Sequence, residues 1–306
     1  MKNAILLVRL SGILFFIGRA IQHIWFETPY RFFFWSRSLM EPFVNSFLGM
    51  EWNQYMVSKE VDLFWTQAIQ GLGVFFALCA VLLMSPLWKH VLTRIALGLA
   101  LVLFIPFVYL KFLGSVWHIL QLFEFGLQVG VILLLVVQPK DNKVFITALK
   151  TMIAITFTAH GLYAMNVFPR PNAFIQMTSA SLHISNAHAA IVLWVAGLLD
   201  IVLSLAIWTR NKAILKPVLI YTTLWGFLTA FARLWANVYG FDFWNGVWQW
   251  SFAFLVRTPH FLVPLSLCLV FWKEFKMKSP QHARTCSNKR IAQKGSNALA
   301  GTPVPI

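Results

Sequence analysis

The sequence predicts an all-α, polytopic membrane protein built as an eight-helix bundle. Hydrophobic residues make up 59% of the 306 residues and charged residues only 11%, whereas soluble domains use roughly 25% charged residues. Eight apolar runs approach the length of about 20 residues at which a helix crosses a bilayer. A helix satisfies all its backbone groups within one such run, whereas the strands of a membrane barrel would be about ten residues long.

Short links follow predicted spans 2, 4 and 6, whereas the outer links 27–62, 164–188 and 239–251 are longer. The spans occupy Ala4–Trp25, Leu63–Met84, Val91–Leu110, Val116–Val137, Val144–Tyr163, Ala189–Trp208, Pro217–Val238 and Phe252–Trp272. The segment 27–62 is too long to be a simple connection. It mixes aromatic with charged residues, which is typical of segments that lie at the level of the lipid headgroups.

Lysine and arginine residues are alternately frequent and sparse in consecutive links. They are frequent after spans 2, 4 and 6, and seven of the 25 follow span 8. The positive-inside rule therefore predicts a multi-pass membrane protein with both termini cytoplasmic. We expect this membrane to be the bacterial inner (plasma) membrane. The net charge of +15 then indicates topology and attraction to the lipid bilayer. No nucleic acid is expected as a partner, because the basic tail lacks interleaved aromatic residues.

The sequence also suggests two four-helix halves, at 1–138 and 139–276. Spans 1 and 5 both carry a glycine in their outer part, Gly18 and Gly161, and are followed by proline, arginine and phenylalanine; spans 2 and 6 both carry a polar residue near glycine. An even number of spans in each half makes the halves parallel, as in repeat-built transporters. Residues 277–306 are rich in Ser, Asn, Gly and Pro, which predicts a disordered, basic cytoplasmic tail.

With this topology, polar residues from several spans fall at similar depth near the outer leaflet. Ionisable residues inside spans are energetically costly, so each is a candidate functional residue. We interpret the cluster as the wall of an outward-facing ligand pocket covered by the aromatic segment Tyr30–Tyr55. Its predicted members are Arg19, His23, His118, Gln121, Glu124, His160, Arg233, Arg257 and His260.

Glu124 is the acid at the centre of this cluster. Polar residues recur along span 4 at spacings of three, three and four, which places them on one helix face. A carboxylate at that depth requires a cation, and we expect Arg257 to pair with it, with Arg19 and Arg233 as alternatives. Asp200, near the middle of span 6, is expected to lie outside the pocket, either paired with Gln70 or protonated.

The surplus of arginine over acid favours an anionic or polarised ligand. The alternative is that the same residues are contacts between helices, since buried Arg–Glu and His–Gln pairs serve that purpose. Five histidines in the outer half raise the question of haem or a metal. No two of them share a span at a spacing of three or four, so we predict no metal site, and a quinone or a haem remains an open cofactor. Motifs for nucleophilic catalysis or nucleotide binding are absent from the sequence.

Short motifs resemble the DoxX-like family of bacterial multi-pass membrane proteins. Val8–Gly18 has an arginine, a glycine three residues later, aromatic residues and a second glycine, and Gln70 and Asp200 lie near glycines. The run His160–Ala164, followed by prolines and Phe174, is also similar to that family. The resemblance implies four-helix units, and some members are associated with quinone-linked sulfur oxidation or oxidative stress. This chain departs from it by being twice the usual length.

Three functions remain open from the sequence. The first is a DoxX-like, non-enzymatic membrane protein that binds a quinone or another lipophilic or anionic molecule. The second is a redox or transfer enzyme that acts on a lipid-borne substrate through the His, Arg and Glu residues. The third is a small-solute transporter, for which the parallel halves and a proton site at Asp200 would be the basis.

Overall fold

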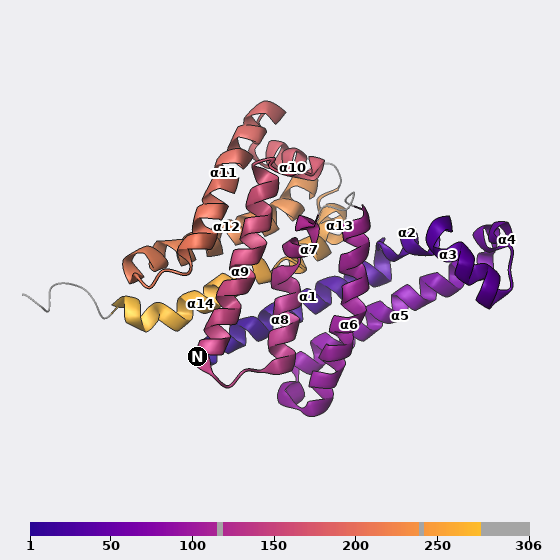
Figure 1. Ribbon diagram of the computed structural model, residues 1–306, viewed down its shortest axis with the longest axis horizontal. Coiled ribbons are helices and arrows are strands. Elements are labelled where there is room, and N and C mark those ends of the chain that lie inside the picture. Colours follow the sequence, from indigo (N-terminus) through magenta and orange to yellow (C-terminus); the bar gives the residue numbers. More distant parts are fainter. Residues whose placement is uncertain (115–118, 239–241, 277–306) are drawn as a thin grey trace, which may run out of the picture. The chain divides into compact units, whose positions relative to one another are not determined.

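The computed structural model describes residues 1–114, 119–238 and 242–276, and the regular elements within them are helices (Figure 1). The long helices are α1 (Lys2–Trp25), α5 (Lys59–Met84), α6 (Val91–Gly114), α9 (Asn142–Ala164), α11 (Asn186–Ala206), α12 (Lys212–Val238) and α14 (Pro259–Lys276). The shorter helices are α2 (Tyr30–Phe34), α3 (Arg37–Phe43), η1 (Val44–Leu48), α4 (Trp52–Val57), η2 (Pro86–Lys89), α7 (Leu120–Glu124), α8 (Gly126–Val137), α10 (Asn172–Leu182) and α13 (Phe243–Leu255).

Six of the predicted spans are continuous helices. Helices α1, α5, α6, α9, α11 and α12 are each long and apolar enough to cross a membrane. They correspond to predicted spans 1, 2, 3, 5, 6 and 7. The described chain is therefore all-helical, and its long apolar helices indicate a membrane-embedded, multi-pass protein.

The fourth predicted span is not one helix. Within the described residues it is divided at Phe125 into α7 and α8, and the start of the prediction, Val116–His118, lies outside them. Thr156 of α9 binds both sides of the division. Its hydroxyl accepts a hydrogen bond from Leu127 N at 3.0 Å and lies 3.4 Å from Phe123 O, to which it donates. The interruption therefore needs no water, because one threonine satisfies the backbone groups that it frees.

The eighth predicted span is also divided. Helices α13 and α14 are bent by 50° at the link Val256–Thr258, and count as one span only if the pair is taken together. The segment 239–251 was expected to be an outer loop, but it is helical from Phe243, where α13 begins. Residues 239–241 lie outside the described residues. Among the described helices, six are long and apolar enough to cross a membrane, or seven if the bent pair is taken as one span.

The chain forms two compact units, Met1–Leu269 and a second that starts at Val270. The described part of the second unit is the end of α14, and the predicted disordered tail 277–306 lies outside the described residues. In the first unit, α1 packs along α5, and α9 packs against both α8 and α11. The α9–α11 contact is close because a Cβ added to Gly161 would lie 2.7 Å from Gly197 O, and one on Gly197 would lie 2.6 Å from Gly161 O.

The segment 27–62 folds into short helices beside the start of α5 (Figure 1). Its small core consists of Met40, Val44, Trp52 and Tyr55. The Tyr55 hydroxyl donates a hydrogen bond to Phe34 O at 3.1 Å and accepts one from the Trp65 indole at 2.8 Å. The predicted loop is thus an aromatic helical subdomain.

Arginine side chains from neighbouring helices bind the C-terminal ends of two apolar helices. Arg9 donates to Leu83 O at 2.5 Å and to Met84 O and Ser85 O at the end of α5. Arg94 donates to Val136 O at 2.8 Å at the end of α8. The last carbonyl groups of a helix have no partner within it and carry partial negative charge. These arginines therefore neutralise helix ends on the side of the bundle where the basic links lie.

Replacing Thr156 with Val should destabilise the α7–α8 division. Valine has nearly the shape of threonine but leaves Leu127 N–H and Phe123 O without their partner, so the free energy of unfolding should fall by about 1–2 kcal/mol. Thermal unfolding in detergent measures the effect. Thr156→Ser keeps the hydroxyl and is the control. Equal stability of the Val and Ser variants would contradict this role.

Candidate functional site

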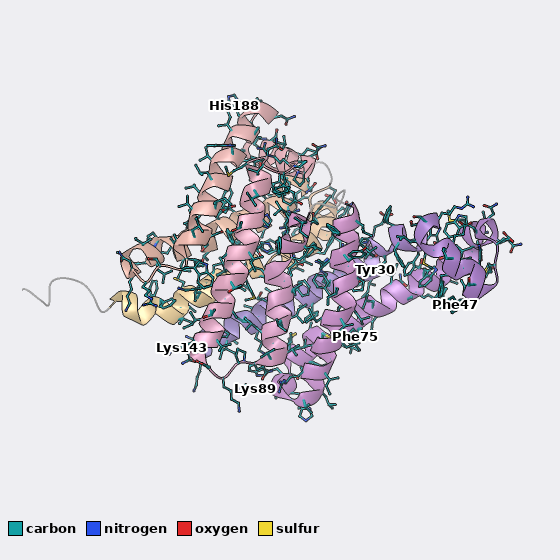
Figure 2. All side chains as sticks on the ribbon, in the orientation of Figure 1. Tyr30, Phe47, Phe75, Lys89, Lys143 and His188 are labelled. Carbon is teal, nitrogen blue, oxygen red and sulfur yellow. The ribbon has the colours of Figure 1, made fainter. Side chains whose placement is uncertain are left out.

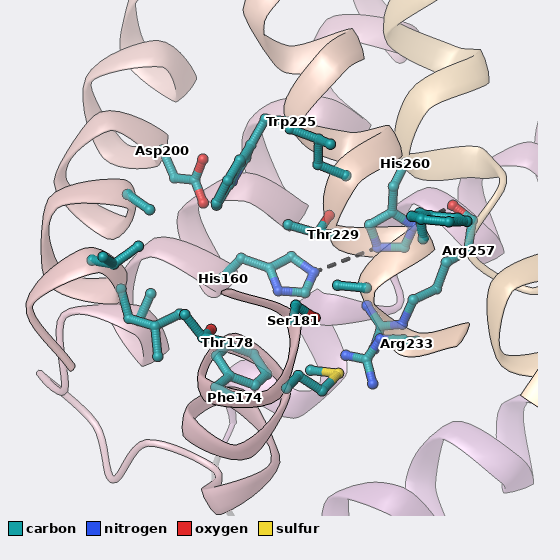
Figure 3. A pocket seen from close by; sticks show the side chains of 18 of the residues that line it. His160, Phe174, Thr178, Ser181, Asp200, Trp225, Thr229, Arg233, Arg257 and His260 are labelled. Carbon is teal, nitrogen blue, oxygen red and sulfur yellow. Dashed lines mark hydrogen bonds between the residues drawn. The ribbon is translucent and has the colours of Figure 1, made fainter. Parts of the chain in front are cut away.

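A cavity of about 320 Å³ lies among α9, α10, α11, α12 and the α13–α14 link (Figure 3). We call this cavity the pocket. Most of its lining is aliphatic or aromatic. Its ionisable side chains are His160 from α9, Asp200 from α11, Arg233 from α12, Arg257 from the link and His260 from α14. Four of these five residues belong to the predicted cluster.

Two histidines meet in the wall of the pocket, and an acid lies behind them. His160 Nε2 is 3.4 Å from His260 Nε2, and the two rings are inclined by 66° (Figure 3). His160 Nδ1 is 3.3 Å from Glu124 Oε1. His260 Nδ1 is 3.1 Å from the carbonyl oxygen of Arg257. We call Glu124, His160 and His260 the Glu–His–His trio.

The division between α13 and α14 positions His260. Pro259 is the first residue of α14, where its fixed φ and missing N–H suit the start of a helix. Helix α12 approaches this turn closely at Gly226, because a Cβ there would lie 2.1 Å from His260 O. On the other side, a Cβ on Gly18 of α1 would lie 2.8 Å from Leu255. The two glycines therefore allow α12 and α1 to pack closely against the link.

Packing of aromatic and aliphatic side chains positions the other end of the trio. Leu120 of α7 packs against Ala159 and Tyr163 of α9, which brings Glu124 beside His160. The ring of Phe174 from α10 stacks against His160 with centroids 6.2 Å apart. Glu124 is 6% exposed, so its carboxylate is removed from lipid and from solvent.

Glu124 does not pair with an arginine, contrary to the prediction. Its partners are His160 and Gln121, whose Nε2 donates to Glu124 Oε2 at 2.9 Å. Within the described residues, the guanidinium groups of Arg233 and Arg257 make neither a hydrogen bond nor an ion pair. They extend into the same part of the pocket (Figure 3) and act on each other and on Glu124 only through longer-range electrostatics. The histidine stands between the acid and the arginines, which explains the difference.

Asp200 lies in the wall of the pocket, so the prediction that it lies outside is wrong. It is 3% exposed, and its Oδ1 has no hydrogen-bond partner among the described residues. The side chain of Trp225 from α12 lies beside it (Figure 3). The expected partner Gln70 instead donates to Ile24 O at 3.3 Å. Asp200 follows Ala196 and Leu193 at spacings of four and seven on the pocket face of α11.

Arg19 and His23 belong to a separate network around α1. The Arg19 guanidinium donates to Gln22 Oε1 at 2.8 Å and to Gln128 Oε1 at 2.6 Å. It lies 4.1 Å from the ring centroid of Phe107, with three further phenylalanine rings around it. His23 Nδ1 is 2.6 Å from Arg19 O. These are contacts between helices, and neither residue lines the pocket.

The remaining predicted site residues are not among the described lining of the pocket, and neither is the segment that was predicted to cover it. Gln121 lines a second cavity of about 250 Å³ together with Lys111, and His118 lies outside the described residues. Among the described lining of the pocket, no residue comes from 27–62. Helix α10 takes the place expected for the segment Tyr30–Tyr55, because its apolar face packs toward α11 and α12.

A scan against protein-family models, a search of curated proteins and a search of solved structures each found no match. The residues of the pocket must therefore carry the functional argument.

Sequence reasoning missed the uncharged polar residues and the aromatic residues of the pocket. Trp225 and Thr229 lie on α12, and Thr178 and Ser181 on α10. Thr229 could have been found because it precedes Arg233 by four residues, on the same helix face. The α10 residues could not be placed as long as 164–188 was treated as an outer loop.

The histidine pair does not fit a haem. A metal bound in line between two imidazoles would hold their nitrogens about 4 Å apart, at roughly 2 Å from each. Here the two Nε2 atoms approach to 3.4 Å and face each other directly, which leaves no room for a porphyrin between the rings. In the part of the chain that the structure describes, no group of three or more His, Cys, Asp or Glu could hold a metal ion.

Substitution of Gly226 tests the close approach that positions His260. Gly226→Ala places a methyl group 2.1 Å from His260 O, so α12 or the start of α14 must move. We expect the free energy of unfolding to fall by about 1–3 kcal/mol, as measured by thermal unfolding. Gly98→Ala is the matched control, since no atom lies within 4 Å of the new methyl group. If both variants are equally stable, the close approach is not required.

Proposed function

We propose that this protein binds an amphiphilic molecule with an anionic headgroup in the pocket. The observation that carries this proposal is the pair Arg233 and Arg257, two guanidinium groups without an anionic partner among the described residues, in the wall of a mostly apolar cavity. Like charges held close together in a medium of low polarity are costly to maintain. An anion between them would remove their repulsion and accept several charge-assisted hydrogen bonds.

The rim of the pocket supports a lipid-borne ligand. Leu182, Val192 and Leu228 line the cavity and are 53%, 39% and 53% exposed, so they face outward from the bundle. Around long apolar helices, such a surface meets acyl chains. A ligand dissolved in the bilayer could enter sideways, with its headgroup at the arginines and its apolar part against Trp225 and the rim. An anionic lipid has this chemistry, and a quinone shares the apolar part but offers carbonyl acceptors in place of a charge.

A transfer or redox enzyme is the second candidate. The observation that favours it is the contact between His160 and His260 in the pocket wall, which puts two proton-transferring groups beside the ligand site. The transporter hypothesis rests on Asp200, whose carboxyl group lies in the same wall.

For the membrane arrangement, we propose eight crossings in a bacterial inner membrane, with both termini cytoplasmic. The pair α7–α8 would serve as a divided fourth crossing and the pair α13–α14 as a bent eighth. In Figure 2, Lys89 and Lys143 lie at one edge of the first unit and His188 at the opposite edge. This separation of basic links supports the positive-inside orientation. Membership of the DoxX-like family and the parallel halves 1–138 and 139–276 remain predictions of the same kind.

Reporter fusions test the orientation. A reporter active only in the periplasm should give no signal when fused after residue 306, because the end of the chain is expected in the cytoplasm. The same reporter fused after His183, in the expected outer segment, should be active and shows that the fusion is exported. A strong signal at residue 306 would contradict the even number of crossings.

Replacing each arginine with glutamine tests whether the pocket binds an anionic headgroup. The probe is lysophosphatidylglycerol in dodecyl maltoside, and lysophosphatidylcholine with the same chain is the zwitterionic counterpart, which has no net charge. We expect the wild type to bind the first in preference, and Arg233→Gln and Arg257→Gln each to weaken binding roughly tenfold to a hundredfold, because each removes charge-assisted hydrogen bonds. Native mass spectrometry measures the bound fraction.

Two further results separate a binding role from a structural one. Arg37→Gln removes an exposed arginine of α3 outside the pocket lining, and should leave binding unchanged. Without the probe, the pocket variants should melt at or above the wild-type temperature, because removing one of two like charges relieves repulsion. If they unfold, or if they bind as well as the wild type, the arginines do not hold the headgroup.

A further inference from the structure

The Glu–His–His trio lies between the pocket and the second cavity, and the proposed function uses only the pocket. His160 and His260 line the pocket. Glu124 lies behind His160 and accepts a hydrogen bond from Gln121, which lines the second cavity with Lys111. Polar side chains therefore lie in sequence from one cavity to the other.

The number of protons in the trio follows from its contacts. Glu124 Oε1 makes no hydrogen bond among the described residues, and it faces His160 Nδ1 at an ion-pair distance of 3.3 Å. His160 faces His260 through the two Nε2 atoms, and His260 Nδ1 faces the Arg257 carbonyl, which can only accept. For a hydrogen to lie in each of these three contacts, three protons are needed. Two neutral imidazoles supply one each and a carboxylate supplies none.

One additional proton must therefore reside on the trio when all three contacts are made. It can reside on Glu124, which then donates to His160, or on His160 as an imidazolium beside the carboxylate. Both arrangements have no net charge. Loss of this proton leaves one contact without a hydrogen and gives the trio a charge of −1 beside the two arginines.

The charged groups around the trio come from each helix that packs against it. Arg233 of α12 and Arg257 of the link act on both histidines, and Asp200 of α11 lies in the same pocket wall. Tyr163 of α9 is near Glu124. Helix α10 contributes only uncharged residues to the pocket. Asp200 is thus the other pocket group whose titration could act on a bound anion.

We propose that Glu124, His160 and His260 act as one proton-carrying unit that couples anion binding in the pocket to the uptake of one proton. This inference rests on the proposed binding function. At low pH the trio is neutral and the arginines attract the anion. At higher pH the deprotonated trio competes with the anion for the arginines, so binding draws one proton back.

Affinity measured across pH tests the coupling. The probe is again lysophosphatidylglycerol, whose phosphodiester keeps one negative charge from mildly acidic to mildly alkaline pH. In the wild type, affinity should fall by up to about tenfold for each pH unit above the titration of the trio, as one linked proton requires. Calorimetry in two buffers of different ionisation enthalpy should show uptake of close to one proton per bound probe in that range.

Glu124→Gln is the decisive variant. Its amide nitrogen can donate to His160 Nδ1 while its oxygen accepts from Gln121, so it imitates the protonated trio without a removable proton. We expect its affinity to be independent of pH and to match the wild type at low pH. Glu41→Gln, the same change at an exposed carboxylate of α3, should keep the wild-type pH dependence. If Glu124→Gln does not fold, the proton count of the wild type decides.

The outcomes separate failure of the coupling from failure of the proposed function. Wild-type binding without pH dependence, or an unchanged dependence in Glu124→Gln, overturns the coupling alone. Loss of the dependence in Asp200→Asn assigns the proton to Asp200 and also overturns it. If the wild type does not bind the probe at any pH, or binds it equally well without Arg233 and Arg257, the proposed function fails and the coupling fails with it.

Discussion

The pocket depends on the interruption of the last apolar helix pair at Val256–Thr258. An interruption inside an apolar bundle must satisfy its own backbone groups. Here Arg257 N donates to Phe254 O, Thr258 N to Leu255 O and His260 N to Arg257 O. The link is therefore self-sufficient, and its side chains are available for other contacts. As a result Arg257 and His260 reach the cavity from a bend of 50°, where they meet residues of α9 and α12.

The same physical constraint, a cation in apolar surroundings, has two solutions in this molecule. Arg19 is 3% exposed and is held by two glutamine oxygens and four phenylalanine rings. Oxygen acceptors and aromatic faces together compensate for much of the lost hydration. Arg233 and Arg257 have no such shell among the described residues. A group that is satisfied by its own chain stabilises the fold, and a group left without a partner at a cavity is available for a ligand. This contrast separates contact residues from site residues.

The sequence predicted the long helices well because length and apolarity alone determine them. It failed at Phe125 and at Val256–Thr258, where the interruption depends on partners distant in the chain. Thr156 stabilises one interruption and Gly226 accommodates the other, and neither is near it in the sequence. Residue types and approximate depth identified His160, Arg233, Arg257 and His260. Depth along a helix does not give the direction of a side chain around its axis, so it could not show that Arg19 and His23 lie outside the pocket and that Asp200 lies in its wall.

The charges of the pocket also bear on which amphiphile it would hold. Two unit charges 4 Å apart interact by about 4 kcal/mol at the effective dielectric constant of a protein surface. A neutral quinone offers carbonyl acceptors to the guanidinium groups but leaves their mutual repulsion in place. A phosphate, a carboxylate or an anionic reduced quinone removes it. If the trio releases its proton, its negative charge itself offsets part of the repulsion between the arginines. An anionic ligand then gains less affinity over a neutral one. Arg233 and Arg257 interact both with the headgroup of the ligand and with the Glu–His–His trio. The preference of the pocket for a charged headgroup therefore depends on whether the trio is protonated.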